Sequence, residues 1–293
     1  MRLGLVTPIV TRHPTRDAAW TADAGPEDLR AIAVAADHLG YHHLTCSEHV
    51  AVPRSAVATR GACYWDPLAT FGFLAAVTTR VRFVTHVLVL GYHHPLAIAK
   101  RYGTLDRLCG GRLVLGVGVG TLAEEFALLG APFDDRGPRF VDGLRALRAA
   151  FGRREPAYVG PHHRFGEVVV EPCGVQSEVP IWVGGRSARS LRRAVELADG
   201  WDPFGLGLDA LATLLARARD TAAWQRRVRP LELVLPLEAV LDPVDPAERR
   251  QLCDLAERHR ALGTTVLNCR FRHRSLAHYL EQLEAVAAEL APS

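Results

Sequence analysis

Short apolar runs alternate with stretches of helical periodicity eight times along the chain. The apolar runs predict strands over Arg2–Ile9, His42–His49, Val81–Leu90, Arg112–Gly120, Pro180–Gly185, Gly200–Phe204, Leu231–Leu241 and Thr264–Phe271. Apolar positions three and four residues apart predict helices over Glu27–Leu39, Asp66–Thr78, Pro95–Leu108, Arg136–Phe151, Ser187–Ala198, Leu208–Arg227, Pro246–Leu262 and Leu276–Leu290. Eight such units with nearly continuous apolar strands predict an α/β fold, a parallel (β/α)8 barrel, with a doubly wound open sheet as the alternative.

Three segments are longer than the connections that a minimal barrel needs. Thr11–Pro26 and Ala51–Trp65 each follow a predicted strand, and loops in that position build the active site of a barrel. The segment 153–179 is an insertion before the fifth strand, with a hairpin predicted from Ala157–Val159 and Glu167–Val170. We expect residues 1–293 to form one domain from which 51–65 and 153–179 protrude.

Composition narrows the class of protein. The chain has 293 residues, 48% of them hydrophobic, which is enough for a large buried core. A formal net charge of +3, evenly spread, argues against a nucleic-acid-binding protein. No apolar stretch has the length that crosses a bilayer and no leader pattern is visible, so we expect a cytoplasmic protein without a membrane partner. The six cysteines form no C-x-x-C pair and are interpreted as reduced thiols.

Two strand ends rich in glycine lie far apart in the chain. One carries Gly116, Gly118 and Gly120, and the other reads Gly184-Gly185-Arg186-Ser187 ahead of a helix. Glycine lets a backbone approach a flat or charged ligand, and a helix N-terminus attracts anions. The first run lacks the G-x-G-x-x-G spacing of a dinucleotide site. The pair therefore indicates either two tight turns or a cofactor with a ring at one end and a phosphate at the other.

Histidines at strand ends are the other candidates for chemistry. Glu48-His49 closes the second strand, where an imidazole either packs or exchanges a proton near neutral pH. The doublets His42-His43, His93-His94 and His162-His163 suggest a metal at first sight. Adjacent residues on a strand point to opposite faces, and no H-E-x-x-H pattern occurs, so we predict no metal site.

Taken in order, several blocks resemble the luciferase-like monooxygenase superfamily of flavin- and deazaflavin-dependent enzymes. The matching residues are Ser47-Glu48-His49, Asp66-Pro67, Leu74–Arg82, Pro95–Lys100, Leu105–Arg112, Gly116–Gly120, Glu125-Phe126, Leu129-Gly130, Arg136, Arg139, Pro180–Gly185 and Ala198–Trp201. They cover residues 1–205, whereas the remainder fits only the barrel pattern. The Pro180–Arg186 block most resembles the actinobacterial branch that uses the deazaflavin coenzyme F420, and we expect a homodimer.

The resemblance implies a luciferase-like TIM barrel with the cofactor at its mouth. The ring is expected against Glu48, His49, Thr85, His86, Gly118, Val119, Gly120 and Thr121. The phosphate is expected on Gly184, Gly185, Arg186 and Ser187, and the resemblance also implies a cis peptide at His86–Val87. Aromatic residues suggest a substrate pocket with Trp65, Tyr92 and His93.

The resemblance also implies the kind of reaction. Thr121 stands where the sugar-phosphate dehydrogenase branch has a glutamate, and Lys100 is the only lysine, so oxidation of a sugar phosphate is disfavoured. We expect hydride transfer between reduced F420 and a small-molecule or peptide substrate, with reduction of a C=C or C=N bond preferred. His49 is the expected proton donor, and Glu48 is expected to shape the ring pocket. The alternatives are a monooxygenase that uses reduced FMN and O2, and a flavin-binding protein without turnover.

Overall fold

Eight parallel strands close into a barrel in the computed structural model, which describes residues 1–14 and 18–290. The strands are β1 (Arg2–Leu5), β3 (His43–Cys46), β5 (Arg82–Thr85), β7 (Leu113–Gly118), β10 (Ile181–Gly184), β11 (Gly200–Asp202), β12 (Glu232–Pro236) and β13 (Val266–Cys269). They pair in chain order, β13 pairs with β1, and the pairing of β7 with β10 completes the ring. The predicted closed parallel barrel is therefore confirmed, and the open sheet is excluded.

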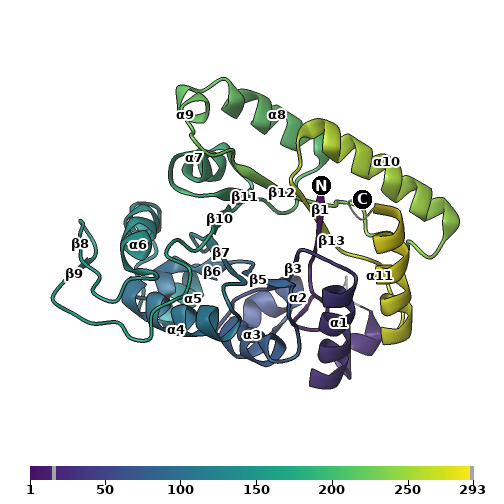
Figure 1. Cartoon of the computed structure of the whole chain (residues 1–293), viewed down its shortest axis with the longest axis horizontal. Helices are drawn as coiled ribbons and strands as arrows, with labels where there is room; N and C mark the ends of the chain where they lie inside the picture. Colours follow the sequence, from purple (N-terminus) through teal and green to yellow (C-terminus); the bar gives the residue numbers. More distant parts are fainter. Residues whose placement is uncertain (15–17, 291–293) are drawn as a thin grey trace.

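Eight long helices, all within the described ranges, surround the barrel (Figure 1). They are α1 (Pro26–His38), α3 (Pro67–Ala75), α4 (Pro95–Leu108), α6 (Arg136–Ala150), α7 (Ala188–Leu197), α8 (Leu208–Arg219), α10 (Pro246–Leu262) and α11 (Leu276–Leu290). Local sequence starts several of them, because Asp66 and Asp245 accept hydrogen bonds from first-turn N–H groups and a proline follows each. Each predicted helix thus has an observed counterpart.

The inside of the barrel is filled with side chains from alternate strand positions. Val84, Val114, Trp182, Val234 and Val266 form one buried cluster from five different strands. The N-terminal end of the barrel is closed by the indole of Trp182, whose ring stacks on His42 at 6.0 Å between centroids. His43 is fully buried there and meets the same indole edge-on at 5.4 Å. These histidines are thus packing residues at the base of the barrel.

Shorter elements join or interrupt this frame. The strands are β2 (Thr11–Arg12), β4 (Cys63–Tyr64), β6 (Leu88–Val89), β8 (Tyr158–Val159) and β9 (Arg164–Phe165). The helices are η1 (Ala19–Ala22), η2 (Arg54–Ala56), α2 (Val57–Arg60), η3 (Leu90–Tyr92), α5 (Ala123–Leu128) and α9 (Ala222–Gln225). The strand predicted over Val81–Leu90 is divided into β5 and β6 by the cis peptide His86–Val87, as the resemblance implied.

Two predicted elements differ from the structure. The helix predicted over Leu208–Arg227 ends at Arg219, because the Thr221 hydroxyl accepts from the N–H of Trp224 and starts α9. The hairpin of the 153–179 insertion pairs β8 with β9, so its second strand precedes the predicted Glu167–Val170. The hairpin projects beyond α6 (Figure 1).

A buried carboxylate of α6 explains where that hairpin forms. Asp142 accepts from the Tyr158 hydroxyl at 2.6 Å and from the N–H groups of His162 and His163 at 3.0 and 2.9 Å. It thereby fixes the turn between β8 and β9. The chain therefore turns at these residues, and the second strand of the hairpin begins at Arg164.

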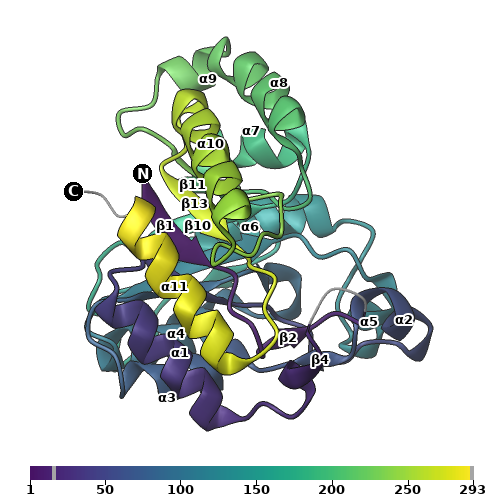
Figure 2. The same ribbon diagram turned by 90° about the vertical axis from the view of Figure 1, so that its right-hand side faces the viewer.

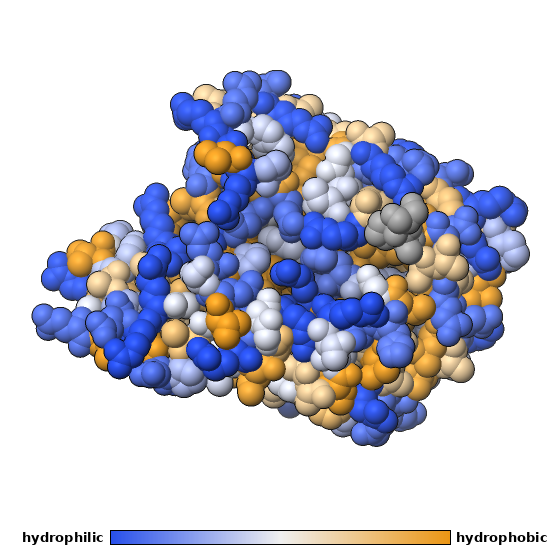
Figure 3. Space-filling view, in the orientation of Figure 1, coloured by the Kyte–Doolittle hydropathy of each residue, from blue (hydrophilic) through white to orange (hydrophobic). Residues whose placement is uncertain are grey.

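The surface is mixed in character. Hydrophilic side chains dominate the face seen in Figure 1, interrupted by small apolar groups (Figure 3). None of the helices in the described part of the chain is long and apolar enough to cross a membrane.

Asp37 joins the end of α1 to the start of β5, and its loss is expected to destabilise the fold. Its carboxylate accepts from the N–H groups of Thr79, Arg80 and Val81 at 3.1, 2.6 and 2.7 Å. Burial would raise the pKa of Asp37, but these hydrogen bonds hold it below the ordinary 3.8. Asp37→Ala leaves three N–H groups without an acceptor and should lower the free energy of unfolding by about 2–3 kcal/mol.

Urea unfolding at several pH values tests this prediction. Because the pKa of Asp37 is lower in the folded than in the unfolded chain, the stabilisation is complete above the unfolded pKa. This stabilisation should disappear as the pH falls through the folded pKa. The free energies of unfolding of the natural chain and of Asp37→Ala should therefore converge in acid. Glu27→Ala removes an exposed carboxylate of the same helix and should change little. A loss of unfolding free energy in Asp37→Ala that is the same at every pH would contradict the role assigned to Asp37.

Candidate active site

The C-terminal ends of the strands open into a mouth that is covered by short elements. In Figure 2, β2, β4, α2 and α5 lie on the side of the barrel away from the two chain termini. β2 pairs with β4, which ties Thr11–Arg12 to the end of the 51–65 loop. The barrel thus positions residues from several strand ends beneath a layer of loops.

A buried carboxylate on α5 gathers the groups at the end of β3. Glu125 is 0% exposed, and its Oε2 accepts from His49 Nδ1 at 2.6 Å and from the Tyr92 hydroxyl at 2.9 Å. Its Oε1 accepts from the N–H groups of Val50 and Ala51 at 2.7 and 3.2 Å. A carboxylate accepts hydrogen bonds only, so His49 donates through Nδ1. This leaves Nε2 as the atom of His49 that can carry or release a proton.

The charge of Glu125 is retained despite its burial. Burial would raise the pKa of Glu125, but the hydrogen bond from His49, the N–H of Ala51 and the Tyr92 hydroxyl lower it below the ordinary 4.5. The same contact raises the pKa of Tyr92, for which burial is the larger cause. Glu125 and His49 thus form an oriented carboxylate–imidazole pair at the mouth.

Glu48 makes a second carboxylate–imidazole pair beside the first. Its Oε1 lies 2.6 Å from His93 Nε2, and its Oε2 accepts from the N–H of Val89 at 2.7 Å. Glu48 is 8% exposed and so is largely shielded from solvent. The structure therefore brings together four of the predicted site residues, Glu48, His49, Tyr92 and His93. A carboxylate holds each of the last two: Glu125 binds Tyr92, and Glu48 binds His93.

The glycine-rich strand ends make room for a neighbouring side chain. A Cβ on Gly118 would lie 2.5 Å from Val87 Cγ2, and one on Gly184 would lie 2.6 Å from Val87 Cγ1. The Val87 side chain thus lies between Gly118 of β7 and Gly184 of β10. Glycine is required at both positions by this close approach, a reason that the sequence alone does not reveal.

The remaining residues predicted around the ring differ in what they face. Thr85 is 0% exposed and its hydroxyl donates to the carbonyl of Gly116 at 2.8 Å. His86 Nε2 lies 3.3 Å from Asp202 Oδ2, and although burial lowers the pKa of His86, the Asp202 carboxylate raises it above its ordinary value. Thr121 is exposed and its hydroxyl accepts from Arg60 at 3.4 Å.

Two other residues that were predicted to lie near the cofactor ring follow β7. Val119 is half-buried and packs against the core, whereas the carbonyl of Gly120 accepts from Arg136 Nε at 3.3 Å. Gly120 has a φ of 75°, in the left-handed region that favours glycine. The backbone thus turns here from the strand toward α5.

The second glycine-rich end leads into α7 at the same mouth. Gly185 has a φ of 108°, and Ser187 caps the helix by accepting from the N–H of Ser190 at 3.2 Å. Arg186 is exposed and lies over the ring of Phe204, 5.8 Å from its centroid. An exposed helix N-terminus beside a guanidinium suits an anion such as a phosphate. The donor set therefore fits the phosphate expected there.

A pocket of about 170 Å³ lies at the ends of β1, β3 and β13. Its lining includes Thr45, Ser47, Arg60 and Tyr64. The ring of Tyr64 meets that of His49 edge-on at 4.5 Å, which connects this pocket to the carboxylate–imidazole pair. Trp65, predicted to contact substrate, is half-buried and packs against the core. Its backbone N–H donates to the carbonyl of Val10 at 2.9 Å.

Glu125 is the residue that sequence reasoning missed as a functional candidate. It lies in the six-residue helix Ala123–Leu128, which is too short to predict from periodicity, and in the sequence Glu125-Phe126 is only one block of the family resemblance. Its neighbour Phe126, which is fully buried, is the signal that one face of this segment turns inward. Within the described residues, no group of three or more His, Cys, Asp or Glu side chains could hold a metal ion.

The chain is similar in sequence to known proteins along most of its length. The sequence model of the luciferase-like monooxygenases matches residues 1–290. An uncharacterised protein of Mycobacterium tuberculosis is 30% identical over 238 residues, which cover 76% of this chain and 82% of that protein. The F420-dependent glucose-6-phosphate dehydrogenase of Beutenbergia cavernae is 29% identical over 226 residues, 74% of this chain and 65% of that enzyme.

Solved structures share the fold at lower identity. Monooxygenase RslO1 from Streptomyces bottropensis superposes with a TM-score of 0.76 at 22% identity, over 99% of this chain and 98% of that one. The oxygenating constituent of 3,6-diketocamphane monooxygenase from Pseudomonas putida, solved with FMN, gives 0.73 at 18% identity, over 100% and 98%.

Proposed function

Because the chain belongs to the family of luciferase-like monooxygenases, we propose that it is an oxidoreductase that works with reduced coenzyme F420. It would transfer a hydride between the coenzyme and an organic substrate, in the direction that reduces a C=C or C=N bond. The observation that carries the proposal is the His49–Glu125 pair, which orients an imidazole at the barrel mouth. Relatives named as F420-dependent support the choice of cofactor.

The chain offers separate groups for the two ends of such a coenzyme. Gly185 and Ser187 at the start of α7, with Arg186 beside them, would hold the phosphate. The carboxylates of the F420 tail would lie near Arg186 and Arg189, which are both exposed at this helix end. The ring would lie at the mouth, where Val87 fills the space between β7 and β10. When bound, reduced F420 supplies a hydride from C5 of its ring.

The protein supplies position and a proton. The Nδ1–H group of His49 donates a hydrogen bond to Glu125, so Nε2 would be the atom that protonates the substrate. Glu125 holds the imidazole in that orientation and stabilises its positive charge. Glu48 would shape the ring pocket, and Trp65, Tyr92 and His93 would border the substrate.

Cofactor titration is the experiment that tests the proposal. Fluorescence quenching should show F420 binding at least tenfold more tightly than FMN, a difference of about 1.4 kcal/mol. Arg186→Ala should reduce this ratio, because it removes a cation beside the phosphate and the acidic tail. Arg192→Ala removes an exposed arginine six residues further along the chain, in α7, and should leave the ratio unchanged.

The same titration separates the alternatives. Equal affinities, or a preference for FMN, would favour a monooxygenase that uses reduced FMN and O2, as the FMN-bound structure of a related fold suggests. Stoichiometric binding without consumption of reduced cofactor, across a panel of substrates, would favour a flavin-binding protein without turnover.

A further inference from the structure

The inner side of the barrel carries a charged contact just above its apolar cluster. Residues two apart on a strand share a face, so His86 points inward like Val84. Asp202 pairs with Gly184 across β11 and β10, at the strand ends that open into the mouth. In the ring of strands β5 and β11 are three places apart, so His86 and Asp202 approach each other across the barrel.

Asp202 is a buried carboxylate whose charge needs a partner. It is 1% exposed, and neither of its carboxylate oxygens makes a hydrogen bond to any residue in the described ranges 1–14 and 18–290. His86 Nε2 lies 3.3 Å from Oδ2. Because a buried carboxylate without hydrogen bonds is costly unless a cation neutralises it, Asp202 favours the protonated form of His86. His43 lies deeper in the barrel and stays neutral, because burial lowers its pKa well below the ordinary 6.5.

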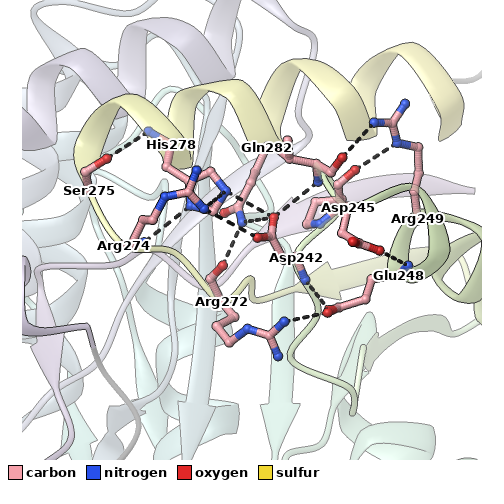
Figure 4. A network of polar contacts seen from close by, with 11 residues as sticks. Asp242, Asp245, Glu248, Arg249, Arg272, Arg274, Ser275, His278 and Gln282 are labelled. Atoms are coloured by element: carbon pink, nitrogen blue, oxygen red, sulfur yellow. Dashed lines mark hydrogen bonds and ion pairs between the residues drawn. The ribbon is translucent and has the colours of Figure 1, made fainter.

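A second carboxylate–imidazole pair shows how such a contact is completed when its role is structural (Figure 4). Asp242 Oδ1 accepts from Gln282 Nε2 at 2.8 Å and from the N–H of Val244 at 3.2 Å. His278 Nε2 lies 3.1 Å from the same oxygen, and His278 Nδ1 accepts from the N–H of Arg274 at 3.4 Å. Both ring nitrogens of His278 therefore have partners within the protein.

His86 differs in its second ring nitrogen. Within the described part of the chain, His86 Nδ1 has no hydrogen-bond partner, and this atom is not fully buried. The side chain of His86 is 15% exposed and that of Asp202 is 1% exposed, so a ligand in the mouth meets the imidazole rather than the carboxylate. Protonated His86 thus presents an N–H with a positive charge, and the strongest acceptor for such a donor is an anion.

We infer that the His86–Asp202 pair selects a cofactor whose ring is itself an acid. The inference rests on the proposed function, because it concerns the ring that would lie at this mouth. F420 is an 8-hydroxy-5-deazaflavin, and its ring hydroxyl is a phenol whose negative charge, after ionisation, spreads over the conjugated ring to the carbonyl oxygens. Oxidised FMN lacks this hydroxyl, so its ring stays neutral near neutral pH. His86 therefore favours the ionised deazaflavin ring over a neutral flavin, separately from the arginines near the phosphate.

The ionisation of bound F420 tests this inference. Absorbance follows the ring hydroxyl through a pH titration, with the coenzyme in solution or saturated with protein. In the natural complex the hydroxyl should ionise at a pH about one unit lower than in solution, a tenfold preference for the anion, because an opposite charge favours the ionised form. His86→Gln should abolish this shift. Asp202→Asn should abolish it too, because His86 then lacks the carboxylate that keeps it protonated.

His278→Gln is the matched control, since it changes the imidazole of the other pair in the same way and should ionise F420 like the natural chain (Figure 4). Circular dichroism reports whether each variant is folded, and Asp202→Asn, which keeps the shape of the side chain, decides the matter if His86→Gln does not fold. A natural complex without the shift, or a shift that survives in His86→Gln or Asp202→Asn, would overturn the inference alone. Absence of F420 binding to the natural chain would overturn the proposed function and this inference together.

Discussion

Replacing His49 by alanine is expected to slow turnover by about 10²–10⁴-fold, the range typical of a lost general acid. Cofactor affinity should change little, because the groups proposed to hold the phosphate belong to α7. The reason is geometric: the His49 Nδ1 proton is committed to Glu125, which leaves Nε2 as the group that can protonate a substrate at the mouth.

The measurement is the rate at which bound reduced F420 is oxidised, followed by the absorbance of the oxidised coenzyme with a panel of organic acceptors. His38→Ala, an exposed histidine of α1, serves as the control and should behave like the natural chain. Turnover that survives in His49→Ala would assign the proton to another group. A large loss of F420 affinity would instead make His49 a binding residue.

Replacing Glu125 by alanine is expected to lower the free energy of unfolding by about 3–5 kcal/mol, as for removal of one partner of a buried charge pair. The substitution leaves the Tyr92 hydroxyl and the N–H groups of Val50 and Ala51 without their acceptor. It also releases His49, so turnover should fall together with stability.

Urea unfolding of Glu125→Ala beside Glu124→Ala provides the comparison, since Glu124 is the exposed acid next to it in α5. The folded pKa of Glu125 is lowered, so its stabilisation is complete above the unfolded pKa and disappears as the pH falls through the folded value. The two variants should therefore differ most at neutral pH and converge in acid. Similar stabilities at pH 7 would show that the buried network does not stabilise the fold.

The barrel could be predicted from the sequence because its strands and helices have different apolar periods. Each strand is buried on both faces and each helix on one, so the pattern of apolar positions separates them. The break at Thr221 and the position of β9 depend on hydrogen bonds to a hydroxyl and to Asp142. Thr221 caps α9 from three residues away, a local signal that the apolar periodicity through Leu208–Arg227 outweighed. Asp142 lies 16 to 21 residues from its donors and meets them only in the folded chain.

The candidate site was predictable only in part. Glu48 and His49 stand at a strand end, where a barrel places its chemistry, and this position can be found in the sequence. Glu125 could not be found in this way, because its burial depends on how α5 packs over the mouth. Gly118 and Gly184 resemble ligand-binding glycines, yet the side chain that approaches them is Val87, whose position follows from the backbone between β5 and β6.

The two sides of the mouth come from different parts of the gene. The groups proposed for the cofactor lie between Glu48 and Asp202, within the region that carries the family resemblance, whereas Arg270 and Tyr279, which line the pocket at the ends of β1, β3 and β13, lie beyond it. Mutations in the last part of the gene can therefore reshape this wall of the pocket while the cofactor side keeps its sequence. Such a division lets selection diversify substrates within one family without rebuilding the redox chemistry.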